Sequence, residues 1–377
     1  MLLVNSRVRG GVEEVVVALA KGLASRNYET HLAAPAPLLE SWRAELAGQR
    51  VRQVAVELGG LRRAGEFGRL ARYLREHRIR LLNTHLFRST LFAAPIARAA
   101  GVPVIIETAH GPEAWRRGWL KRSGVVDRLI ERLVTANIAV SEANRRYLIE
   151  QKRYPPEKIH VIPNGRDLSR FASVTTAQVA AVRARVDAQP EDRLLLAVGR
   201  LEPQKDPLTL LDAFARVAQS FPAAKLVLAG EGSLRTEVES RVSAYRLRER
   251  VALAGFQHDV APWYHAAEIV VLSSLYEGMP LVAIEAGAAG RPVVATAVDG
   301  TLEVIEDGRT GMLTPPRDPA ALAAAICRLL GDPQTARQMG LAAQQRIQRH
   351  FSFDRQLDRT IAVFEAYLGA VARRQAA

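Results

Sequence analysis

The sequence has little of what marks secreted, membrane-spanning or metal-dependent proteins. A single cysteine, Cys327, among 377 residues excludes a disulfide framework and favours a reducing compartment. No apolar run reaches the roughly 18 residues that a membrane-spanning helix needs, and the N-terminus lacks the basic lead-in of a signal peptide. No Asp-x-Asp occurs, so nothing indicates a carboxylate pair that would hold a divalent cation on a phosphate. These absences predict a cytoplasmic protein with no bound metal and no cofactor.

Almost all of the excess positive charge lies in the first half of the chain. Residues 1–165 hold 27 Lys and Arg against 15 Asp and Glu, whereas residues 166–377 hold 25 against 24. Much of this excess lies at 61–80 and at 115–132, where cations alternate with Trp, Leu, Val and Ile. That mixture favours a segment lying on an anionic membrane surface, with an ordinary solvated basic face as the alternative. No DNA- or RNA-binding motif accompanies the charge, so no nucleic-acid partner is expected.

Apolar runs of strand length alternate with helical patterns, which predicts two doubly wound halves, each with a parallel sheet. A chain of 377 residues, 48% of them hydrophobic, is long for one core and sufficient for two. We expect domains at 1–165 and 166–352, followed by a helix within 353–377. The expected strands are residues 2–4, 30–34, 53–56, 81–84, 104–107, 138–140 and 160–162, then 194–198, 225–228, 251–253, 269–272, 293–295 and 311–313.

The most informative stretch is 277–292, in which Glu277 and Glu285 bracket a Gly-Met-Pro turn and the start of an apolar helix. An apolar strand at 269–272 precedes it, and Pro280 suits the first turn of the helix. Acidic residues rarely lie among Leu, Val, Ile and Ala without a partner. A hydroxyl-rich ligand at the helix start would be such a partner. A capped surface helix with one glutamate reaching solvent is the alternative.

A second loop carries two cations. The strand at 194–198 ends in Gly199, and Arg200 and Lys205 follow before a helix at 208–218. Ligands of open α/β sheets bind outside the carboxyl ends of the strands. Arg offers a planar fork for phosphate oxygens, and Lys offers a mobile point charge. Alone, this loop would read as solvated surface, but together with the two glutamates it favours a diphosphate attached to a sugar.

The first half has candidates of its own. Gly10 and Gly11 follow the first strand and open a helix at 12–24, so backbone amides can approach a ligand closely. An ordinary tight turn is the alternative. The pattern is not Gly-x-Gly-x-x-Gly, which argues against an NAD enzyme. His110 and, more weakly, His85 follow other strand ends, although a lone histidine is more often structural.

In the order and spacing of these pieces the chain resembles the retaining nucleotide-sugar glycosyltransferases of family 4, which have the GT-B fold. That fold consists of two Rossmann-like, doubly wound domains facing across a cleft, and the final helix returns to the N-terminal domain. The resemblance covers nearly the whole chain. The matching segments are Gly-Gly-Val-Glu at 10–13, Ala-Val-Ser at 139–141, Val-Ile-Pro-Asn-Gly at 161–165, the loop at 200–205, Leu-Ala-Gly-Glu-Gly at 228–232 and the block at 277–292.

Two features depart from the family. Its members usually have a longer lead into the first strand, which implies that this chain starts a few residues late or that the strand is short. The Gly-Gly that follows a later strand in the family is Asp299-Gly300 here, next to the expected position of the sugar.

The resemblance implies roles for individual residues. Arg200 and Lys205 would stabilise the departing diphosphate without a metal, Glu277 would position sugar hydroxyls, and Glu285 would accept from ribose hydroxyls. His110 would contact the transferred sugar or shape the acceptor site. The candidate catalytic residues are therefore Arg200, Lys205, Glu277 and His110. The other candidate donor-binding residues are Gly10, Gly11, Glu231, Phe256, Gly278, Met279 and Leu281.

The activity implied is a retaining, metal-independent hexosyl transfer from a UDP- or GDP-sugar to a lipid-linked or anionic glycan acceptor. Envelope polysaccharide assembly in bacteria, on the inner face of the cytoplasmic membrane, is the expected setting. Retaining members are described as substituting at the front face, with the leaving phosphate helping to deprotonate the acceptor hydroxyl. Two alternatives stay open: a nucleotide-sugar 2-epimerase of the same fold, which needs no acceptor, and a non-catalytic nucleotide-sugar binder.

Overall fold

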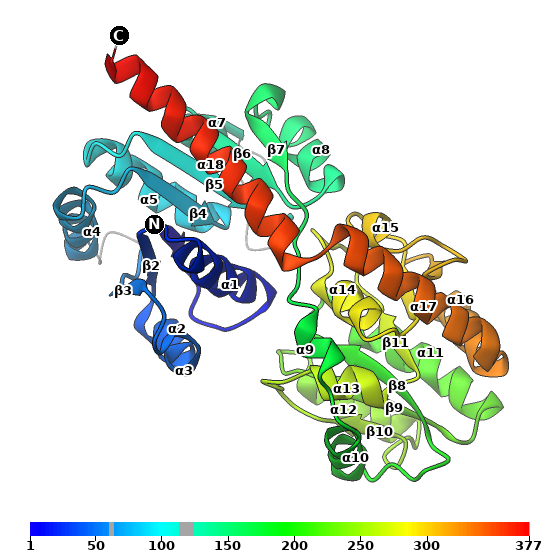
Figure 1. The fold of residues 1–377 in the computed structure, drawn as a ribbon. Coiled ribbons are helices and arrows are strands. Elements are labelled where there is room, and N and C mark those ends of the chain that lie inside the picture. Colours follow the sequence, from blue (N-terminus) through cyan, green and yellow to red (C-terminus); the bar gives the residue numbers. More distant parts are fainter. Residues whose placement is uncertain (60–63, 113–123, 377) are drawn as a thin grey trace. The chain divides into compact units, whose positions relative to one another are not determined.

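The structure is a computed structural model that describes residues 1–59, 64–112 and 124–376 (Figure 1). The chain divides into two compact units. The N-terminal unit comprises Met1–Asn164 and Arg355–Ala377, and the C-terminal unit comprises Gly165–Asp354. Each unit is built around its own parallel sheet, so each has a separate hydrophobic core.

Within its described residues, the N-terminal unit has a seven-stranded sheet with the order β3-β2-β1-β4-β5-β6-β7. Its strands are β1 (Leu2–Val4), β2 (Thr30–Ala34), β3 (Val51–Ala55), β4 (Leu81–His85), β5 (Val104–Ala109), β6 (Ala136–Ala139) and β7 (Ile159–Val161). Its helices are α1 (Gly11–Ser25), α2 (Ala36–Ser41), α3 (Arg43–Leu46), α4 (Ala64–Glu76), α5 (Phe87–Ala99), α7 (Gly124–Glu131), α8 (Glu142–Glu150) and the 3-10 turn η2 (Pro156–Lys158). The strand order reverses between β1 and β4, so the loops after these two strands flank a topological switch point.

The C-terminal unit, all of whose residues are described, has a six-stranded sheet with the order β10-β9-β8-β11-β12-β13. Its strands are β8 (Arg193–Val198), β9 (Ala224–Ala229), β10 (Val251–Leu253), β11 (Ile269–Leu272), β12 (Val293–Thr296) and β13 (Gly311–Thr314). Its helices are α9 (Ser169–Ala172), α10 (Thr176–Arg185), α11 (Pro207–Ser220), α12 (Arg235–Ala244), α13 (Ala261–Ala266), α14 (Leu281–Ala288), α15 (Thr301–Val304), α16 (Pro319–Gly331) and α17 (Pro333–His350). Here the order reverses between β8 and β11.

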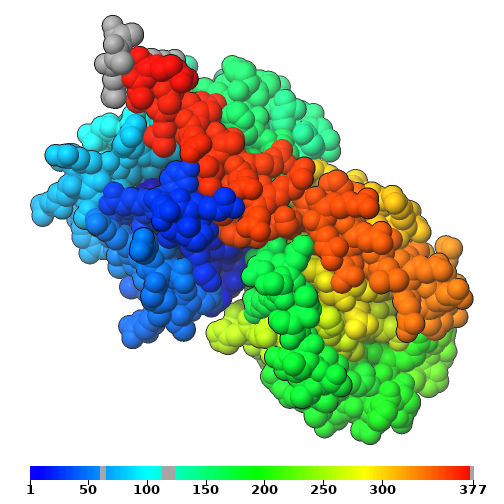
Figure 2. Space-filling view, viewed as in Figure 1, coloured from blue at the N-terminus to red at the C-terminus, as the bar shows by residue number. Residues whose placement is uncertain are grey.

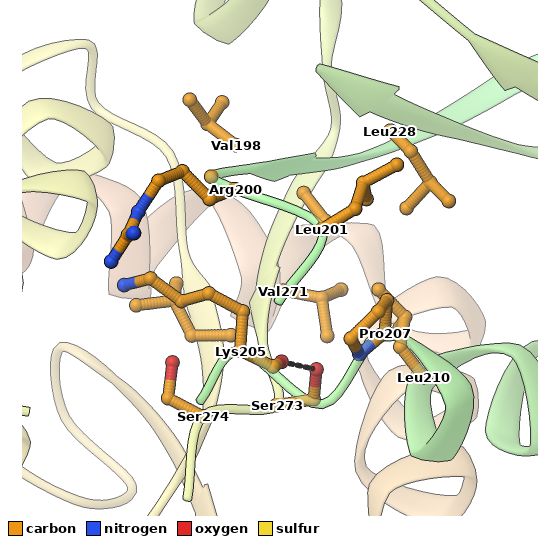
Figure 3. A pocket seen from close by; sticks show the side chains of 13 residues that line it. Val198, Arg200, Leu201, Lys205, Pro207, Leu210, Leu228, Val271, Ser273 and Ser274 are labelled. Carbon is orange, nitrogen blue, oxygen red and sulfur yellow. Dashed lines mark hydrogen bonds between the residues drawn. The ribbon is translucent and has the colours of Figure 1, made fainter. Parts of the chain in front are cut away.

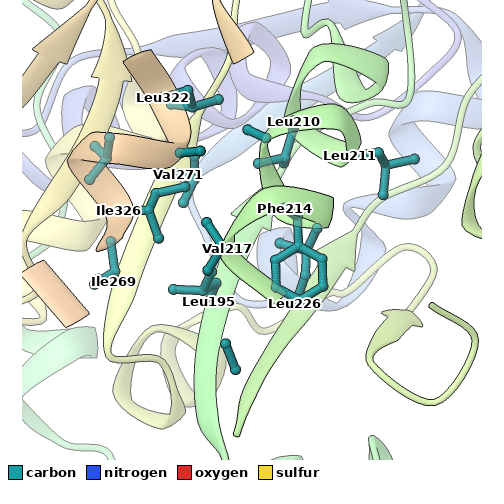
Figure 4. Packing of buried hydrophobic residues seen from close by; sticks show 14 of the residues in the cluster. Leu195, Leu210, Leu211, Phe214, Val217, Leu226, Ile269, Val271, Leu322 and Ile326 are labelled. Carbon is teal, nitrogen blue, oxygen red and sulfur yellow. The ribbon is translucent and has the colours of Figure 1, made fainter. Parts of the chain in front are cut away.

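A tightly packed core fixes the two central strands of the C-terminal unit. Figure 4 shows α11 and α16 packing their apolar side chains onto β8, β9 and β11. Phe214 and Ile326 are fully buried, as are Leu195 and Ile269 on the strands beneath them. Burying one such side chain contributes roughly 1.5–3 kcal/mol, so β8 and β11 form a rigid base for the loops that follow them.

The long C-terminal helix α18 (Phe353–Ala376) lies on the surface of the N-terminal unit in the view of Figure 2, where it is coloured red. It is tied to that unit by polar side chains. Tyr367 Oη lies 3.0 Å from His160 Nε2, and Tyr28 donates to Glu365. Contacts between residues more than two hundred positions apart in sequence therefore join the C-terminal helix to this unit.

The predicted pair of parallel, doubly wound sheets is confirmed, and each expected strand is present: β1, β2, β10 and β11 have the expected bounds, and the other strands differ by one or two residues at an end. The edge strand β3 begins at Val51 rather than residue 53 because Val51 is already paired with Thr30 of β2. Its first residues include the exposed Arg52, so the pairing extends beyond the apolar pattern. Pro280 is also displaced: it caps α14 with an extended backbone (ψ 102°) and is not part of the first turn.

Candidate functional site

The two predicted loops of the C-terminal unit meet at its topological switch point. One loop follows β8 and carries Arg200 and Lys205, and the other follows β11 and begins with Ser273 and Ser274. All four residues line one pocket. Figure 3 shows the nitrogen-bearing ends of Arg200 and Lys205 on the same side of it. The carboxyl ends of adjacent parallel strands therefore bring the two loops together, as expected for a ligand site in such a sheet.

Hydrogen bonds join the two loops into one unit. Ser273 Oγ donates to the carbonyls of Lys205 and Asp206, at 2.7 and 3.0 Å. The Leu275 amide donates to Gln204 O at 2.8 Å, and the Gln204 side chain donates back to the Tyr276 carbonyl at 3.1 Å. The backbone that carries Lys205 is thereby held from both sides, which limits the movement of its side chain to its own rotamers.

Glu277 and Lys205 form an ion pair at this junction. Glu277 is buried, and its Oε1 accepts from Lys205 and, at 2.6 Å, from Ser274 Oγ. Lys205 keeps 24% of its side chain exposed, whereas Glu277 keeps 7%. The carboxylate thus holds the ammonium group beside the pocket, where its remaining N–H donors can serve an anionic ligand.

Arg200 is more loosely held than Lys205. Its side chain is exposed, and its guanidinium has a long contact of 3.5 Å with Gln204 Oε1. A guanidinium without a rigid ion pair can reorient, so its planar fork is available to phosphate oxygens. The structure thus places both predicted cations at one pocket, and only Lys205 is held there by an ion pair, with Glu277.

The loop at 277–281 is packed tightly against a neighbouring turn. The amide of Gly300 donates to Glu277 O at 3.1 Å, and a Cβ on Gly300 would lie 2.0 Å from Gly278 O. Met279 is buried, and Leu281 is the first residue of α14. Gly278, Met279 and Leu281 therefore present backbone at the head of α14, beside Glu277.

Glu285 does not line the pocket, and its partners come from the protein. It is buried in α14, where Arg166 contacts its Oε1 at 2.7 Å and Tyr264 Oη donates to its Oε2 at 2.7 Å. Burial raises the pKa of Tyr264 well above its usual value, and the charge of Glu285 adds to the effect. Arg166 and Tyr264 therefore supply partners for this carboxylate from within the protein, and the predicted contact of Glu285 with ribose hydroxyls stays a prediction.

Glu231 and Phe256 lie in neighbouring loops after β9 and β10. A Cβ on Gly255 would come within 3.0 Å of Glu231 Oε1, which places the two loops side by side. Glu231 is exposed and pairs with Arg235 at 2.6 Å. Phe256 is 50% exposed and meets His258 edge to face. An exposed aromatic ring can stack on a flat heterocycle, and a carboxylate in the neighbouring loop can accept hydrogen bonds from the N–H groups of that heterocycle.

In the N-terminal unit, Gly10 caps α1 and Gly11 begins it. The cap has an extended backbone and no side-chain hydrogen bond, so the first amides of α1 are not satisfied by a capping side chain. Glu13 in the first turn is buried, and a Cβ on Gly10 would lie 3.1 Å from its Oε2. The glycine therefore makes room for the carboxylate as well as bringing backbone close to any ligand.

His110 is paired with His85 beside the switch point of the same unit. His85 Nδ1 lies 3.0 Å from His110 Nε2, and the rings are stacked. Burial lowers the pKa of His110 to about 4, and desolvation together with the charge of His110 lowers that of His85 well below 6.5. Both rings are therefore neutral near pH 7, and one donates its N–H to the other. This arrangement gives His110 a fixed orientation and makes it a poor general acid at neutral pH.

Sequence reasoning missed Arg166, Tyr264, Ser274 and Gln204. Arg166 follows the Pro-Asn-Gly turn that supported the family resemblance, so its position was visible, but its partner lies 119 residues away. Ser274 and Gln204 lie close in sequence to the predicted residues Glu277 and Lys205, so they could have been proposed as hydrogen-bonding residues that support this site. No sequence signal indicates Tyr264.

Among the described residues there is no cluster of three or more His, Cys, Asp or Glu side chains that could hold a metal ion. In the same part of the chain, no helix is both long and apolar enough to span a membrane. Half of the basic segment predicted at 115–132, residues 115–123, lies outside the described residues, as do positions 61–63 of the other basic stretch. Its last part forms α7, on which Val125 and Leu129 are 50% and 54% exposed beside exposed Arg128 and Arg132.

The fold and the site define a class: enzymes with two Rossmann-like units and a polar site at the switch point. Residues 192–332 match the family model Glycosyl transferases group 1, and residues 9–170 match Glycosyltransferase Family 4. The D-inositol 3-phosphate glycosyltransferase of Segniliparus rotundus is 32% identical over 318 residues, covering 78% of this chain and 68% of the relative. This chain therefore belongs to the family 4 glycosyltransferases.

Two further similarities extend this placement. The UDP-Gal:alpha-D-GlcNAc-diphosphoundecaprenol alpha-1,3-galactosyltransferase of Escherichia coli is 27% identical, over 70% of this chain and 69% of that protein. The structure of Anabaena Alr3699/HepE in complex with UDP-glucose has a TM-score of 0.84 at 21% identity, covering 97% of this chain and 99% of that one. At this identity the likeness shows the fold, which is GT-B.

Proposed function

We propose that this enzyme transfers a hexose, with retention, from a UDP- or GDP-sugar to a lipid-linked or anionic glycan acceptor in bacterial envelope polysaccharide synthesis. The observation that carries the proposal is the pocket beside β8 and β11, where Glu277 holds the Lys205 ammonium and the Arg200 side chain is exposed. Two cations at one strand edge suit a diphosphate. The names of the Escherichia coli and Anabaena proteins support a nucleotide-sugar donor, and the former supports a polyprenyl-linked acceptor.

In this mechanism the acceptor oxygen forms its bond to the anomeric carbon on the face from which the phosphate leaves. The anomeric carbon–oxygen bond breaks, its electron pair goes to the diphosphate, and the acceptor proton passes to a phosphate oxygen. Lys205 and Arg200 stabilise the charge that develops there, while Glu277 accepts from sugar hydroxyls. Burial lowers the pKa of His110 to about 4, so its ring is neutral at pH 7 and would contact the transferred sugar or shape the acceptor site.

The proposal is tested by incubating the enzyme with a panel of UDP- and GDP-sugars, with and without a membrane lipid extract. We expect nucleoside diphosphate release that increases with the extract, and sugar label that moves into the organic phase with its anomeric configuration retained. Nucleotide release with free epimerised sugar, independent of the extract, would instead identify a 2-epimerase. Binding without turnover for every donor and extract would identify a non-catalytic binder.

Metal removal gives a further prediction. Activity should survive excess EDTA, because Arg200 and Lys205 neutralise the diphosphate in place of a divalent cation. The measurement is donor turnover before and after chelation, with a parallel sample to which Mg²⁺ or Mn²⁺ is returned. Loss of turnover that either cation restores would contradict the proposed phosphate site.

A membrane acceptor would require contact with an anionic lipid surface, and α7 carries suitable residues. Val125 and Leu129 lie one turn apart with half of each side chain exposed, next to exposed Arg128 and Arg132. Each cation near such a surface contributes roughly 1 kcal/mol, and the attraction weakens with salt. We propose that this face and the basic residues at 116–122, which lie outside the described residues, rest on the membrane.

Sedimentation with vesicles tests the membrane contact. The protein should sediment with phosphatidylglycerol-containing vesicles at low salt, remain in solution with pure phosphatidylcholine, and be released at high salt. The double variant Val125→Gln/Leu129→Gln should sediment less while still binding nucleotide. Leu341→Gln, at a residue of similar exposure (53%) in α17, is the matched control and should sediment as the wild type does. Equal sedimentation of all three proteins would refute the assignment of α7.

A further inference from the structure

Helix α7 is turned away from the orientation that its apolar residues favour. The sequence of α7 and of the turn after it places one apolar stripe along the helix, at Val125, Val126, Leu129, Ile130 and Leu133. An amphipathic helix normally buries such a stripe. In the structure Ile130 is buried, and Val126 and Leu133 are partly buried. Val125 and Leu129 are exposed. The helix is thus rotated by roughly a third of a turn from the orientation that would bury the whole stripe.

Two carboxylates occupy the inner side of α7 in place of the stripe. Asp127 and Glu131, four residues apart, are both buried. Asp127 Oδ1 lies 3.4 Å from Lys152 Nζ, and no more than 3% of either side chain is exposed. Glu131 Oε1 lies 3.0 Å from Lys158 Nζ, which also donates to Val134 O at 3.2 Å. Because buried carboxylates are almost never found without such partners, the two lysines determine which side of the helix faces inward.

The lysine that pairs with Asp127 is itself held in place. Its Nζ lies 4.0 Å from the centroid of the Phe87 ring and 5.5 Å from that of Tyr154. A cation over the face of an aromatic ring is attracted by the ring electrons. Phe87 begins α5, and Tyr154 lies between α8 and β7. Lys152 therefore links α7 to two other segments of the unit, and rotation of α7 would leave this buried cation without Asp127.

Stability alone does not account for these ion pairs. Removing two charges from water costs free energy, and an apolar pair of similar volume is often as stable or more stable. Turning Val125 and Leu129 inward would also add apolar burial that the observed orientation gives up. The pairs do supply a defined orientation, because turning the stripe inward would separate both carboxylates from their lysines.

The outer face of α7 is both apolar and positive. Its exposed residues are Val125, Arg128, Leu129 and Arg132. The acidic side chains of α7, Asp127 and Glu131, are on the inner side, so the charge of the outer face comes from the two arginines. Apolar side chains among cations suit the headgroup region of an anionic lipid surface.

We propose that the ion pairs Asp127–Lys152 and Glu131–Lys158 are positioning pairs, which hold the outer face of α7 toward an anionic lipid surface. The inference rests on the membrane contact proposed above and adds the residues that prepare it. If the pairs served only to hold the fold together, their replacement would change the stability of the protein and leave its lipid binding unchanged.

Two measurements test the proposal, the orientation of α7 and the binding of vesicles. Orientation is followed by the rate at which a maleimide reacts with the thiol introduced by Leu129→Cys, in a Cys327→Ser background that removes the native thiol. Leu341→Cys, at a residue of similar exposure in α17, is the matched control for the reagent. Binding is measured without introduced cysteines, by sedimentation with vesicles that contain phosphatidylglycerol or phosphatidylcholine alone.

Both measurements are made on a protein from which the deeper ion pair is removed by Asp127→Leu/Lys152→Met. The matched control is Asp192→Leu/Lys225→Met, because Asp192 and Lys225 form a largely buried ion pair, at 2.9 Å, in the C-terminal unit. The melting temperature of each protein is measured alongside, so that a change in stability is read separately from a change in lipid binding.

In Asp127→Leu/Lys152→Met the apolar stripe is free to turn inward. The thiol at position 129 should react about tenfold or more slowly, because a buried thiol reacts through local opening. Affinity for anionic vesicles should fall roughly tenfold or more, since two apolar side chains no longer enter the lipid. The melting temperature should stay the same or rise. The control pair variant should keep the wild-type reaction rate and vesicle affinity.

The outcomes separate this inference from the proposed function. If the wild type does not bind anionic vesicles, the membrane contact fails and the inference fails with it, whereas sugar transfer to a soluble acceptor would leave the glycosyltransferase activity standing. If the pair variant binds vesicles as the wild type does, or its thiol at position 129 reacts equally fast, only the positioning role is overturned. A wild-type dimer that the pair variant does not form, with no vesicle binding by either, would make the outer face a protein interface and overturn the lipid partner.

A second variant decides if Asp127→Leu/Lys152→Met does not fold. Glu131→Leu/Lys158→Met removes the pair that is nearer to solvent, since 31% of the Lys158 side chain is exposed. Slower reaction at position 129 together with weaker vesicle binding supports the positioning role. Wild-type behaviour in both measurements overturns it.

Discussion

Replacing Lys205 by methionine is expected to lower kcat/KM for the donor about tenfold to a hundredfold, because a charged hydrogen bond to phosphate is worth roughly 1.5–3 kcal/mol. Methionine keeps the apolar stem and removes the ammonium group. Arg200→Met should have an effect of similar size through its own phosphate contacts. Arg309→Met is the matched control: Arg309 is an exposed loop cation of the same unit, 76% exposed, and its loss should leave turnover unchanged.

The ion pair with Glu277 complicates the reading of Lys205→Met, because the variant also leaves a buried carboxylate with one donor fewer. The double variant Lys205→Met/Glu277→Gln separates the two effects. If the loss arises from the phosphate contact, UDP or GDP binds the double variant as weakly as it binds Lys205→Met. If it arises from the uncompensated carboxylate, nucleotide binding recovers when Glu277 is neutralised. Wild-type turnover in both Arg200→Met and Lys205→Met would remove the basis of the donor site.

The sheets could be predicted from the sequence because buried parallel strands are continuous apolar runs that end at glycine or polar residues. Such runs located β8 and β11, and the rule that ligands bind at strand carboxyl ends then led to Arg200, Lys205 and Glu277. Edge strand β3 begins two residues earlier than expected because Val51 and Arg52 are held by pairing with β2, although the side chain of Arg52 is exposed. The pattern of apolar residues along one strand does not reveal which residues pair with a neighbouring strand.

What could not be predicted is how the charges are paired. The sequence interpretation assigned the cations to a diphosphate and the carboxylates to hydroxyls, whereas in the structure Lys205 contacts Glu277. Glu285 obtains its partners from Arg166 and Tyr264, which are 119 and 21 residues away along the chain. Such pairs are fixed by tertiary packing and leave no local pattern. The roles of these side chains in catalysis stay predictions.

At Asp299-Gly300, the departure from the family pattern, the two residues are under different constraints. Asp299 has a φ of +32°, a region that glycine adopts more readily than aspartate. Asp299→Gly, which gives the Gly-Gly of the resembling family, should therefore be tolerated without loss of turnover. Gly300 has no unusual φ, and its constraint is purely steric, because a Cβ would lie 2.0 Å from Gly278 O and 3.1 Å from Met279 Cα.

Gly300→Ala is therefore expected to reduce kcat/KM by about a hundredfold or more. The new methyl group meets backbone atoms, which cannot rotate away, so the loop that carries Glu277 must move. A shift of about 1 Å at a positioning group is enough for a loss of that size. Overpacking also costs roughly 1–3 kcal/mol, so the melting temperature should fall.

Gly331→Ala is the matched control, since a Cβ at Gly331 meets nothing within 4 Å. It should change neither turnover nor stability appreciably. Full activity of Gly300→Ala would mean that the loop at Glu277 does not position the donor.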